Sequence, residues 1–240
     1  MSNELAVVAG ATGALGRAIR SELIEKGLDV LGVARHPDGL ADVVAADLSD
    51  DAAIGEIAAH LDRPVRMAVH VAGPVLAGGV GEVTTEAVLE AVDVKVNGLL
   101  RLVRAVDGHL VPGARIVAIT GHLGYDPVPA SVTAGVANAA VAALVRQLAR
   151  AYGPRGVTCH AVAPGPVESP RLDHLIDHLA SAAGSSADEA RAALMAEAPV
   201  GRLATPEEVA WAVGLLLDDA AAMMDGSTLF LDGGRRTSLP

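Results

Sequence analysis

The sequence predicts an α/β fold in which helices cover both faces of a parallel β-sheet. Short, continuous apolar runs alternate with longer amphipathic stretches along the chain of 240 residues. Strands that are apolar at every position are typical of parallel sheets, because such sheets are buried on both faces. No internal repeat and no linker-like change of composition interrupts this alternation. We therefore expect a single domain that spans residues 1–240.

The elements follow one another in a regular order. Seven apolar runs are predicted to be strands: 4–10, 28–35, 42–48, 65–73, 114–120, 157–165 and 227–234. Four stretches with helical periodicity lie between them: 14–27, 84–108, 131–152 and 206–217. Gly27 would end the first of these helices. The segment 167–203 stands outside the alternation and is rich in alanine, serine and charge, which predicts a helical flap over the site.

The composition excludes several classes of function. The net charge is −11 and aromatic residues make up 2%, so neither a basic stripe nor a base-stacking surface is present. Nucleic-acid binding is therefore not expected. Cys159 is the only cysteine, which rules out an internal disulfide and indicates a reducing, cytoplasmic location. The sequence has no signal-peptide pattern at its start and no uninterrupted apolar stretch of membrane-spanning length, so no membrane partner is expected.

A glycine-rich loop joins the first predicted strand to the first predicted helix. The stretch "VVAGATGALGRAI" (7–19) places the small residues Gly10, Ala14 and Gly16 at this junction. Small residues allow a tight turn and let the backbone approach a pyrophosphate, which then sits at the helix N-terminus. Glycines also occur in ordinary turns, but the position between a strand and a helix favours a dinucleotide site.

From end to end the chain resembles the short-chain dehydrogenase/reductase family. The loop "AGATGALG" (9–16) is similar to the family's TGxxx(A/G)xG, with Ala9 in place of the threonine. "ADLSD" (46–50) resembles the family's aspartate after the third strand. "HVAG" (70–73) occupies the place of NNAG, from which His70 and Val71 depart. "APGPVES" (163–169) resembles the loop on the nicotinamide side, and "APVGRLATPEEVAWAVGLLL" with "STLFLDGG" resembles the C-terminal pattern.

The resemblance implies a Rossmann-type, doubly wound sheet of about seven strands in the order 3-2-1-4-5-6-7. It also implies an oxidoreductase that binds a nicotinamide cofactor. The cofactor residues that it implies are Gly10, Thr12, Ala14, Leu15, Gly16, Arg35, Asp47, Leu48, Ala72, Gly73, Asn138, Pro164, Gly165, Val167 and Ser169.

Arg35 stands at the end of the second predicted strand, where an acidic residue would bind the ribose 2′-hydroxyl of NAD(H). An arginine there would instead pair with a 2′-phosphate, which favours NADP(H). The alternative is a solvated arginine at the end of a strand.

All four catalytic positions implied by the resemblance carry other residues. "DVKVNG" (93–98) has Lys95 in place of the family's asparagine, and "IVAITGHLG" (116–124) has Gly121 in place of its serine. "TAGVANAAV" (133–141) has Ala134 for the tyrosine and Asn138 for the lysine. The spacings between these places agree with the family's, which supports the alignment. The usual general-acid step therefore cannot run with these residues.

Other residues can replace the missing chemistry. The asparagine and the lysine have exchanged places, so Lys95 would keep a positive charge near the ribose or a substrate oxyanion, unless it extends to solvent. His122 and Tyr125, in "GHLGYDP" (121–127), are alternative proton donors, or else part of a pocket wall or a surface loop.

His174 and His178 are four residues apart on a predicted helix, which is a spacing that can bind a metal. No third ligand is apparent, and a solvated or lid-facing helix also explains them. We expect no metal site.

Three functions remain open. The first is an unusual oxidoreductase that binds NADP(H) and takes its proton from Lys95, His122, Tyr125 or water. The second is a cyclase, isomerase or lyase on the same scaffold, and the third is a catalytically silent subunit. The largely intact glycine loop favours the first, although the cofactor site can have been lost with the catalytic residues. An aliphatic flap favours a small hydrophobic substrate, and the helices 84–108 and 131–152 favour a homodimer or homotetramer.

Overall fold

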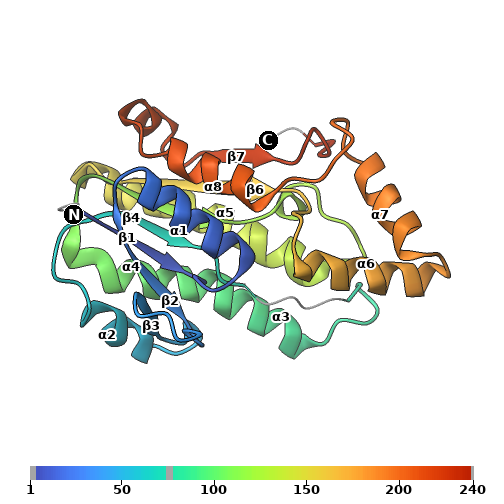
Figure 1. The fold of residues 1–240 in the computed structure, drawn as a ribbon, viewed down its shortest axis with the longest axis horizontal. Coiled ribbons are helices and arrows are strands. Elements are labelled where there is room, and N and C mark those ends of the chain that lie inside the picture. The colour runs from blue at the N-terminus through green and yellow to red at the C-terminus, as the bar shows by residue number, and fades with distance from the viewer. Residues whose placement is uncertain (1–3, 74–77, 239–240) are drawn as a thin grey trace.

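The computed structural model of the chain describes residues 4–73 and 78–238. The strands described there form one parallel sheet in the order β3-β2-β1-β4-β5-β6-β7, which confirms the predicted Rossmann-type topology (Figure 1). Their bounds are β1 (Leu5–Ala9), β2 (Asp29–Ala34), β3 (Val43–Ala45), β4 (Val65–His70), β5 (Leu110–Ile119), β6 (Thr158–Pro164) and β7 (Thr228–Leu231).

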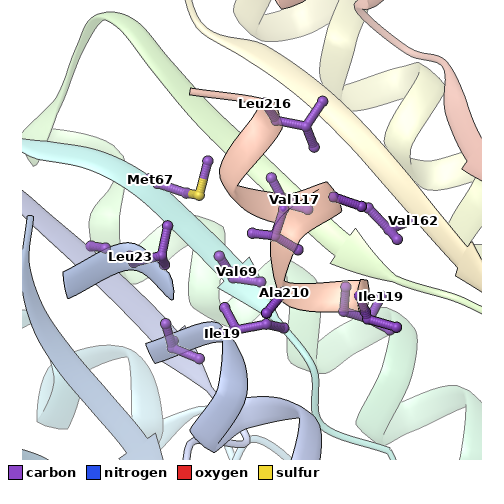
Figure 2. Packing of buried hydrophobic residues seen from close by; sticks show 14 of the residues in the cluster. Ile19, Leu23, Met67, Val69, Val117, Ile119, Val162, Ala210 and Leu216 are labelled. Atoms are coloured by element: carbon purple, nitrogen blue, oxygen red, sulfur yellow. The ribbon is translucent and has the colours of Figure 1, made fainter. Parts of the chain in front are cut away.

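Helices cover both faces of this sheet (Figure 1). One layer consists of α1 (Ala14–Glu25) and α8 (Pro206–Leu215), and the other of α2 (Ala52–Ala58), α4 (Gly98–Val106) and α5 (Val132–Tyr152). Figure 2 shows Ile19 and Leu23 of α1 packed with Met67, Val69 and Val117 from the central strands.

The central strands are buried on both faces, as their apolar runs predict. In β1, Ala6 and Val8 belong to the core beneath α1 and α8, whereas Leu5, Val7 and Ala9 belong to the core beneath α2 and α4. Side chains alternate between the faces of a strand, so a strand of this kind must be apolar at every position. The buried polar side chains inside the strands, Arg115 of β5 and His160 of β6, are exceptions, and both are hydrogen-bonded.

Three elements differ from the sequence prediction. Helix α2 was not predicted, because it has only seven residues, contains Gly55 and buries just Ala53 and Ile57. The stretch 84–108 is not one regular helix: α3 (Thr85–Val92) is followed by a π-helical turn, Asp93–Asn97, and then by α4. Strand β5 begins at Leu110 rather than at 114.

Among residues 4–73 and 78–238, one helix is long and apolar enough to cross a membrane by length and composition, namely α5 with its continuation to Arg155. No stretch of this length was expected from the sequence. In the fold, Val141 and Val145 of this helix pack against β5 and β6, and 44% of the apolar window is buried. A core helix of this kind passes the same test as a membrane span.

The predicted flap contains two helices, α6 (Pro170–Ala183) and α7 (Ala187–Ala196), which lie beyond the ends of the strands (Figure 1). Leu172 and Ile176 of α6 pack with Leu194 and Leu203 in a small core of their own. Part of the aliphatic surface of the flap is therefore used within the flap. This weakens the inference of a hydrophobic substrate from its composition.

Candidate functional site

The loop between β1 and α1 has the geometry of a phosphate cradle. Gly10 has a φ of 85°, and a Cβ on it would lie 2.9 Å from the backbone nitrogen of Ala72. A Cβ on Gly16 would lie 2.1 Å from the carbonyl oxygen of Gly10. Helix α1 begins without a side-chain cap and has no acidic residue in its first turn. Its first N–H groups and its dipole can therefore receive an anion. The residues gathered here include Gly10, Thr12, Ala14, Leu15, Gly16 and Ala72.

Arg35 and Asp47 lie near each other where β2 and β3 end. Arg35 is exposed, and its charge helps to lower the pKa of Asp47. The main cause of this lowered pKa is the hydrogen bond that the Ser49 backbone N–H donates to Asp47, at 3.0 Å. The carbonyl of Leu48 accepts a hydrogen bond from Arg101 at 2.8 Å, so this oxygen already has a partner. The two side chains expected at the adenosine end are thus neighbours.

The loop from Pro164 to Ser169 connects β6 to α6. The backbone N–H of Gly165 donates to the carbonyl of Leu231 at 3.0 Å, and Val167 pairs with Ala204. The Ser169 hydroxyl donates to the carbonyl of Val167 and accepts from the first turn of α6, so it acts as the N-cap of that helix. The four residues expected on the nicotinamide side therefore belong to one fixed loop.

A cavity of about 230 Å³ lies beside this loop, on the side of α8 and β7. Pro166, Trp211 and Arg235 are among the residues that line it. None of the four altered catalytic positions contributes to its lining. The cavity therefore lies apart from those four positions.

Lys95 lies in the π-helical turn and is half-buried at the ends of β4 and β5. Its Nζ donates to the carbonyl oxygen of Ile119 at 3.5 Å. A Cβ on Gly73 would lie 2.8 Å from the Cε of Lys95, so the lysine stem crosses directly over this glycine. Burial, and then the charge of Arg171, lower the pKa of Lys95 to about 8. The ammonium is thus held at the site rather than extended into solvent.

His70, in place of the family's first NNAG asparagine, is buried at the end of β4. Burial, and then the charge of Lys95, lower its pKa to about 3, so the imidazole is neutral. A Cβ on Gly98 would lie 3.0 Å from its Nε2, and this nitrogen has no partner among the described residues. His70 therefore supports the turn that carries Lys95 and is not exposed to substrate.

Asn138 and Gly121 lie directly beside each other at the site. A Cβ on Gly121 would lie 2.7 Å from the Nδ2 of Asn138, so the asparagine amide occupies space beside the glycine. The Oδ1 of Asn138 is buried and has no hydrogen-bond partner within the described residues. Ala134 is half-buried and offers only a methyl group. The positions of the family's serine and tyrosine thus carry no hydroxyl group. Among the described residues, the buried Oδ1 of Asn138 lacks the hydrogen-bond donor that a buried amide oxygen normally has.

His122 and Tyr125 are directed toward the last strand. The Tyr125 hydroxyl is hydrogen-bonded to the hydroxyl of Thr228, and its ring packs edge-on against Phe230 at 4.7 Å. Burial, and then Arg235, lower the pKa of His122. In the sheet order, β7 is two strands away from β5, where Lys95 is bonded. Lys95, His122 and Tyr125 are the proton donors expected from the sequence. Of these three, only Lys95 lies between the ends of β4 and β5.

Arg171 reaches the same point from the flap. Its Nη1 donates to the carbonyl oxygen of Gly73 at 3.3 Å, and desolvation lowers the pKa of its guanidinium. The sequence analysis did not single out Arg171. No motif marks it, because it is an ordinary basic residue in the first turn of an exposed helix.

His174 and His178 are both exposed on α6. Across residues 4–73 and 78–238, no group of three or more histidine, cysteine, aspartate or glutamate side chains is arranged to hold a metal ion.

Known proteins agree with this fold. A family model described as enoyl-(acyl carrier protein) reductase matches residues 10–236. The chain is 28% identical to the 3-oxoacyl-(acyl carrier protein) reductase FabG of Pseudomonas aeruginosa over 98% of both chains. It is 27% identical to the reductase of the same name from Escherichia coli over 96% of both.

Solved structures resemble the whole chain. An actinorhodin polyketide ketoreductase variant with NADPH has a TM-score of 0.90 at 26% identity, covering 98% of both chains. A short-chain dehydrogenase family protein from Francisella tularensis has a TM-score of 0.89 at 24% identity, covering 96% of this chain and 98% of that one, and shows the fold alone. The chain belongs to the short-chain dehydrogenase/reductase family of oxidoreductases. Members of this family act on small molecules and commonly form oligomers.

The buried charge of Lys95 predicts a measurable cost to stability. A pKa lowered from 10.5 to about 8 corresponds to a cost of about 3 kcal/mol, present in full below pH 8. We expect Lys95→Met to raise the free energy of unfolding by up to about this amount at pH 7. The gain should shrink as the pH rises from 8 toward 10.5, because the lysine then becomes neutral in the unfolded chain too. Urea denaturation of the unaltered protein and of Lys95→Met at pH 7 and pH 10 measures this difference in the free energy of unfolding.

Lys26→Met is the matched control, because Lys26 is exposed and pairs only with Glu22 within the described residues. It should change stability by a few tenths of a kcal/mol at either pH. Equal effects of the two substitutions would show that Lys95 carries no desolvation cost.

The contact between Gly121 and Asn138 predicts a coupled pair. Gly121→Ser adds a Cβ at 2.7 Å from the Asn138 amide, which should lower the free energy of unfolding by about 1–2 kcal/mol. Asn138→Ala in the same chain should recover most of this loss. Thermal denaturation of the two single variants and the double variant forms the cycle, and additive effects would contradict the contact.

Proposed function

We propose that this protein is an NADP(H)-dependent oxidoreductase in which Lys95 takes over proton transfer to or from a small carbonyl or hydroxyl compound. The observation that carries the proposal is the half-buried Nζ of Lys95 at the carbonyl of Ile119. Gly121, where the family has its serine, follows two residues later on the same strand end. Lys95 thus places an acid–base group at the strand end that also carries the vacated serine position.

The residues present fit the cofactor. The helix α1 offers open N–H groups to a pyrophosphate, and the close approach of Gly10 to Ala72 leaves no side chain in its way. Arg35 is exposed where a 2′-phosphate would lie. The unpartnered Oδ1 of Asn138 would accept a hydrogen bond from the nicotinamide ribose. When bound, NADPH would supply the hydride.

Lys95 would supply the proton. With a pKa of about 8, its ammonium is charged at neutral pH, yet it releases a proton more readily than an ordinary lysine. In the direction of reduction, Nζ would donate a proton to the carbonyl oxygen as the hydride reaches the carbonyl carbon. In the reverse direction the neutral amine would take the hydroxyl proton.

A second function is favoured by the loss of both hydroxyl-bearing positions. Gly121 and Ala134 cannot orient a carbonyl for hydride transfer, so Lys95 can instead serve as the base of an isomerase, cyclase or lyase. Such an enzyme would turn over substrate without consuming the cofactor, and a silent subunit would do neither. We further propose that the chain forms a homodimer or homotetramer, in keeping with its family.

The assignment of the cofactor is tested by calorimetric titration with NADPH and NADH. Arg35→Gln should weaken NADPH binding by roughly tenfold to a hundredfold, because a charge-assisted contact to phosphate is lost. NADH binding should not change. Arg150→Gln, at an exposed position of α5, should leave both affinities as they are. If the unaltered protein bound NADPH and NADH with equal affinity, Arg35 would not be the residue that binds the 2′-phosphate.

The role of Lys95 is tested by the pH dependence of NADPH oxidation with a panel of carbonyl compounds. The rate of reduction should be constant below pH 8 and fall about tenfold for each pH unit above it, because the neutral amine has no proton to give. Lys95→Met should abolish turnover, and Lys95→Arg should also reduce it strongly although it keeps the charge, because a guanidinium does not give up its proton. Turnover that survives Lys95→Met would overturn the assignment.

A further inference from the structure

The segment that follows β7, residues 232–238, packs on the chain that leaves the flap. It turns back through Gly233 and Gly234, whose φ values of 65° and 80° favour glycine. A Cβ on Gly233 would lie 3.3 Å from the Cβ of Ala198, and a Cβ on Gly234 would lie 3.4 Å from the Cγ of Pro199. We call residues 232–238 the C-terminal strap.

One side of the C-terminal strap is attached to the end of α7 in the flap. The Nη1 of Arg235 donates to the carbonyl oxygen of Leu194 at 2.8 Å, and its Nη2 donates to the carboxylate of Glu197. The side chain of Arg235 is only 10% exposed. Hydrogen bonds from a charged donor are stronger than neutral ones, and two acceptors fix the planar guanidinium in one orientation. Arg235 therefore holds the strap to the flap.

The other side of the strap is attached to the loop that follows Gly121. The backbone N–H and the hydroxyl of Thr237 both donate to one carboxylate oxygen of Asp126, at 2.9 Å and 3.0 Å. The hydroxyl of Ser238 donates to the carbonyl oxygen of Tyr125 at 3.0 Å. The two bonds from Thr237 are the main cause of the lowered pKa of Asp126, so its carboxylate is charged at neutral pH.

Aromatic packing supports the same attachment. The guanidinium of Arg236 stacks on the ring of Phe230 at 3.6 Å, and Phe230 packs edge-on against Tyr125. The hydroxyl of Tyr125 is hydrogen-bonded to Thr228 of β7. The phenol that the sequence offered as a proton donor is therefore part of the contact between the loop 122–126, β7 and the strap.

We propose that the C-terminal strap couples the flap to the end of β5, with Asp126 and Arg235 as the positioning residues. Each of them fixes one side of the strap, and the strap joins the loop behind Gly121 to the end of α7. If either contact is lost, the strap is released and both of its neighbours become more mobile. The effect on turnover rests on the proposed function, whereas the coupling is a property of the protein without ligands.

Hydrogen–deuterium exchange of the full chain without ligands tests the coupling. Asp126→Ala removes the acceptor of Thr237, and amide exchange should become about tenfold faster in α7 as well as in the loop 122–126. Asp126 is bonded to the strap and not to α7, so this effect must pass through the strap. Arg235→Gln should accelerate exchange in the loop by a similar factor. Asp126→Asn keeps an oxygen that accepts from Thr237 and should restore most of the protection.

Two references separate coupling from a general loss of stability. The amides of β4 report global unfolding, so the increases in α7 and in the loop should exceed any increase there. Arg155→Gln is the matched control, because Arg155 forms an exposed ion pair with Asp107 at the opposite edge of the sheet. It should change exchange in neither segment. If each substitution acts only on the segment that it contacts, or if exchange in β4 rises equally, the inference is overturned.

Turnover gives a second readout. Asp126→Ala and Arg235→Gln should each lower kcat about tenfold and leave the KM for NADPH unchanged, because alignment at the end of β5 suffers while the cradle at β1 is untouched. A normal kcat in variants with faster exchange would show that the strap does not position the site. If the unaltered protein oxidises no NADPH with any carbonyl compound, the proposed function fails, and the exchange experiment still decides the coupling.

Discussion

The charge on Lys95 is the interaction around which the rest of the site is arranged. The π-helical turn Asp93–Asn97 directs its stem across Gly73, where only a hydrogen leaves room for it. Its charge acts on the buried imidazole of His70, which burial already keeps neutral, and Arg171 acts on Lys95 in turn. A π turn adds a residue without breaking the helix, and such turns are frequent at functional sites. The electrostatics of the cleft thus follow from one desolvated ammonium and the backbone that holds it.

The cofactor cradle and the catalytic positions are constrained in different ways. Gly10 and Gly16 belong to the packing of the fold itself, since a Cβ on Gly16 would collide with the carbonyl of Gly10. This geometry cannot change without loss of the strand–helix junction. Positions 121 and 134 are constrained less by the backbone: Ala134 is half-buried, and a Cβ on Gly121 would first meet the side chain of Asn138. A chain of this family can therefore keep the strand–helix junction unchanged while the residues at its catalytic positions vary.

The parallel sheet could be predicted from the apolar runs, and its strand order from the family resemblance that the glycine loop and the motif spacings carry. Helix α2 could not, because two buried residues in seven give too little periodicity. The π turn was missed because an inserted residue leaves no mark in the hydropathy. Tyr125 was considered on its phenol alone, and its contact with Thr228 depends on a strand far along the chain. The position of Arg171 could not be predicted, because it depends on the tertiary contact between the flap and Gly73.

The contact between Gly121 and Asn138 links two of the altered positions. A serine at 121 needs the volume that the asparagine amide now occupies. A return to serine at 121 therefore requires a smaller or differently placed side chain at 138 at the same time. Substitutions that restore the ordinary catalytic set one at a time pass through a destabilised chain, so the two positions are bound to change together.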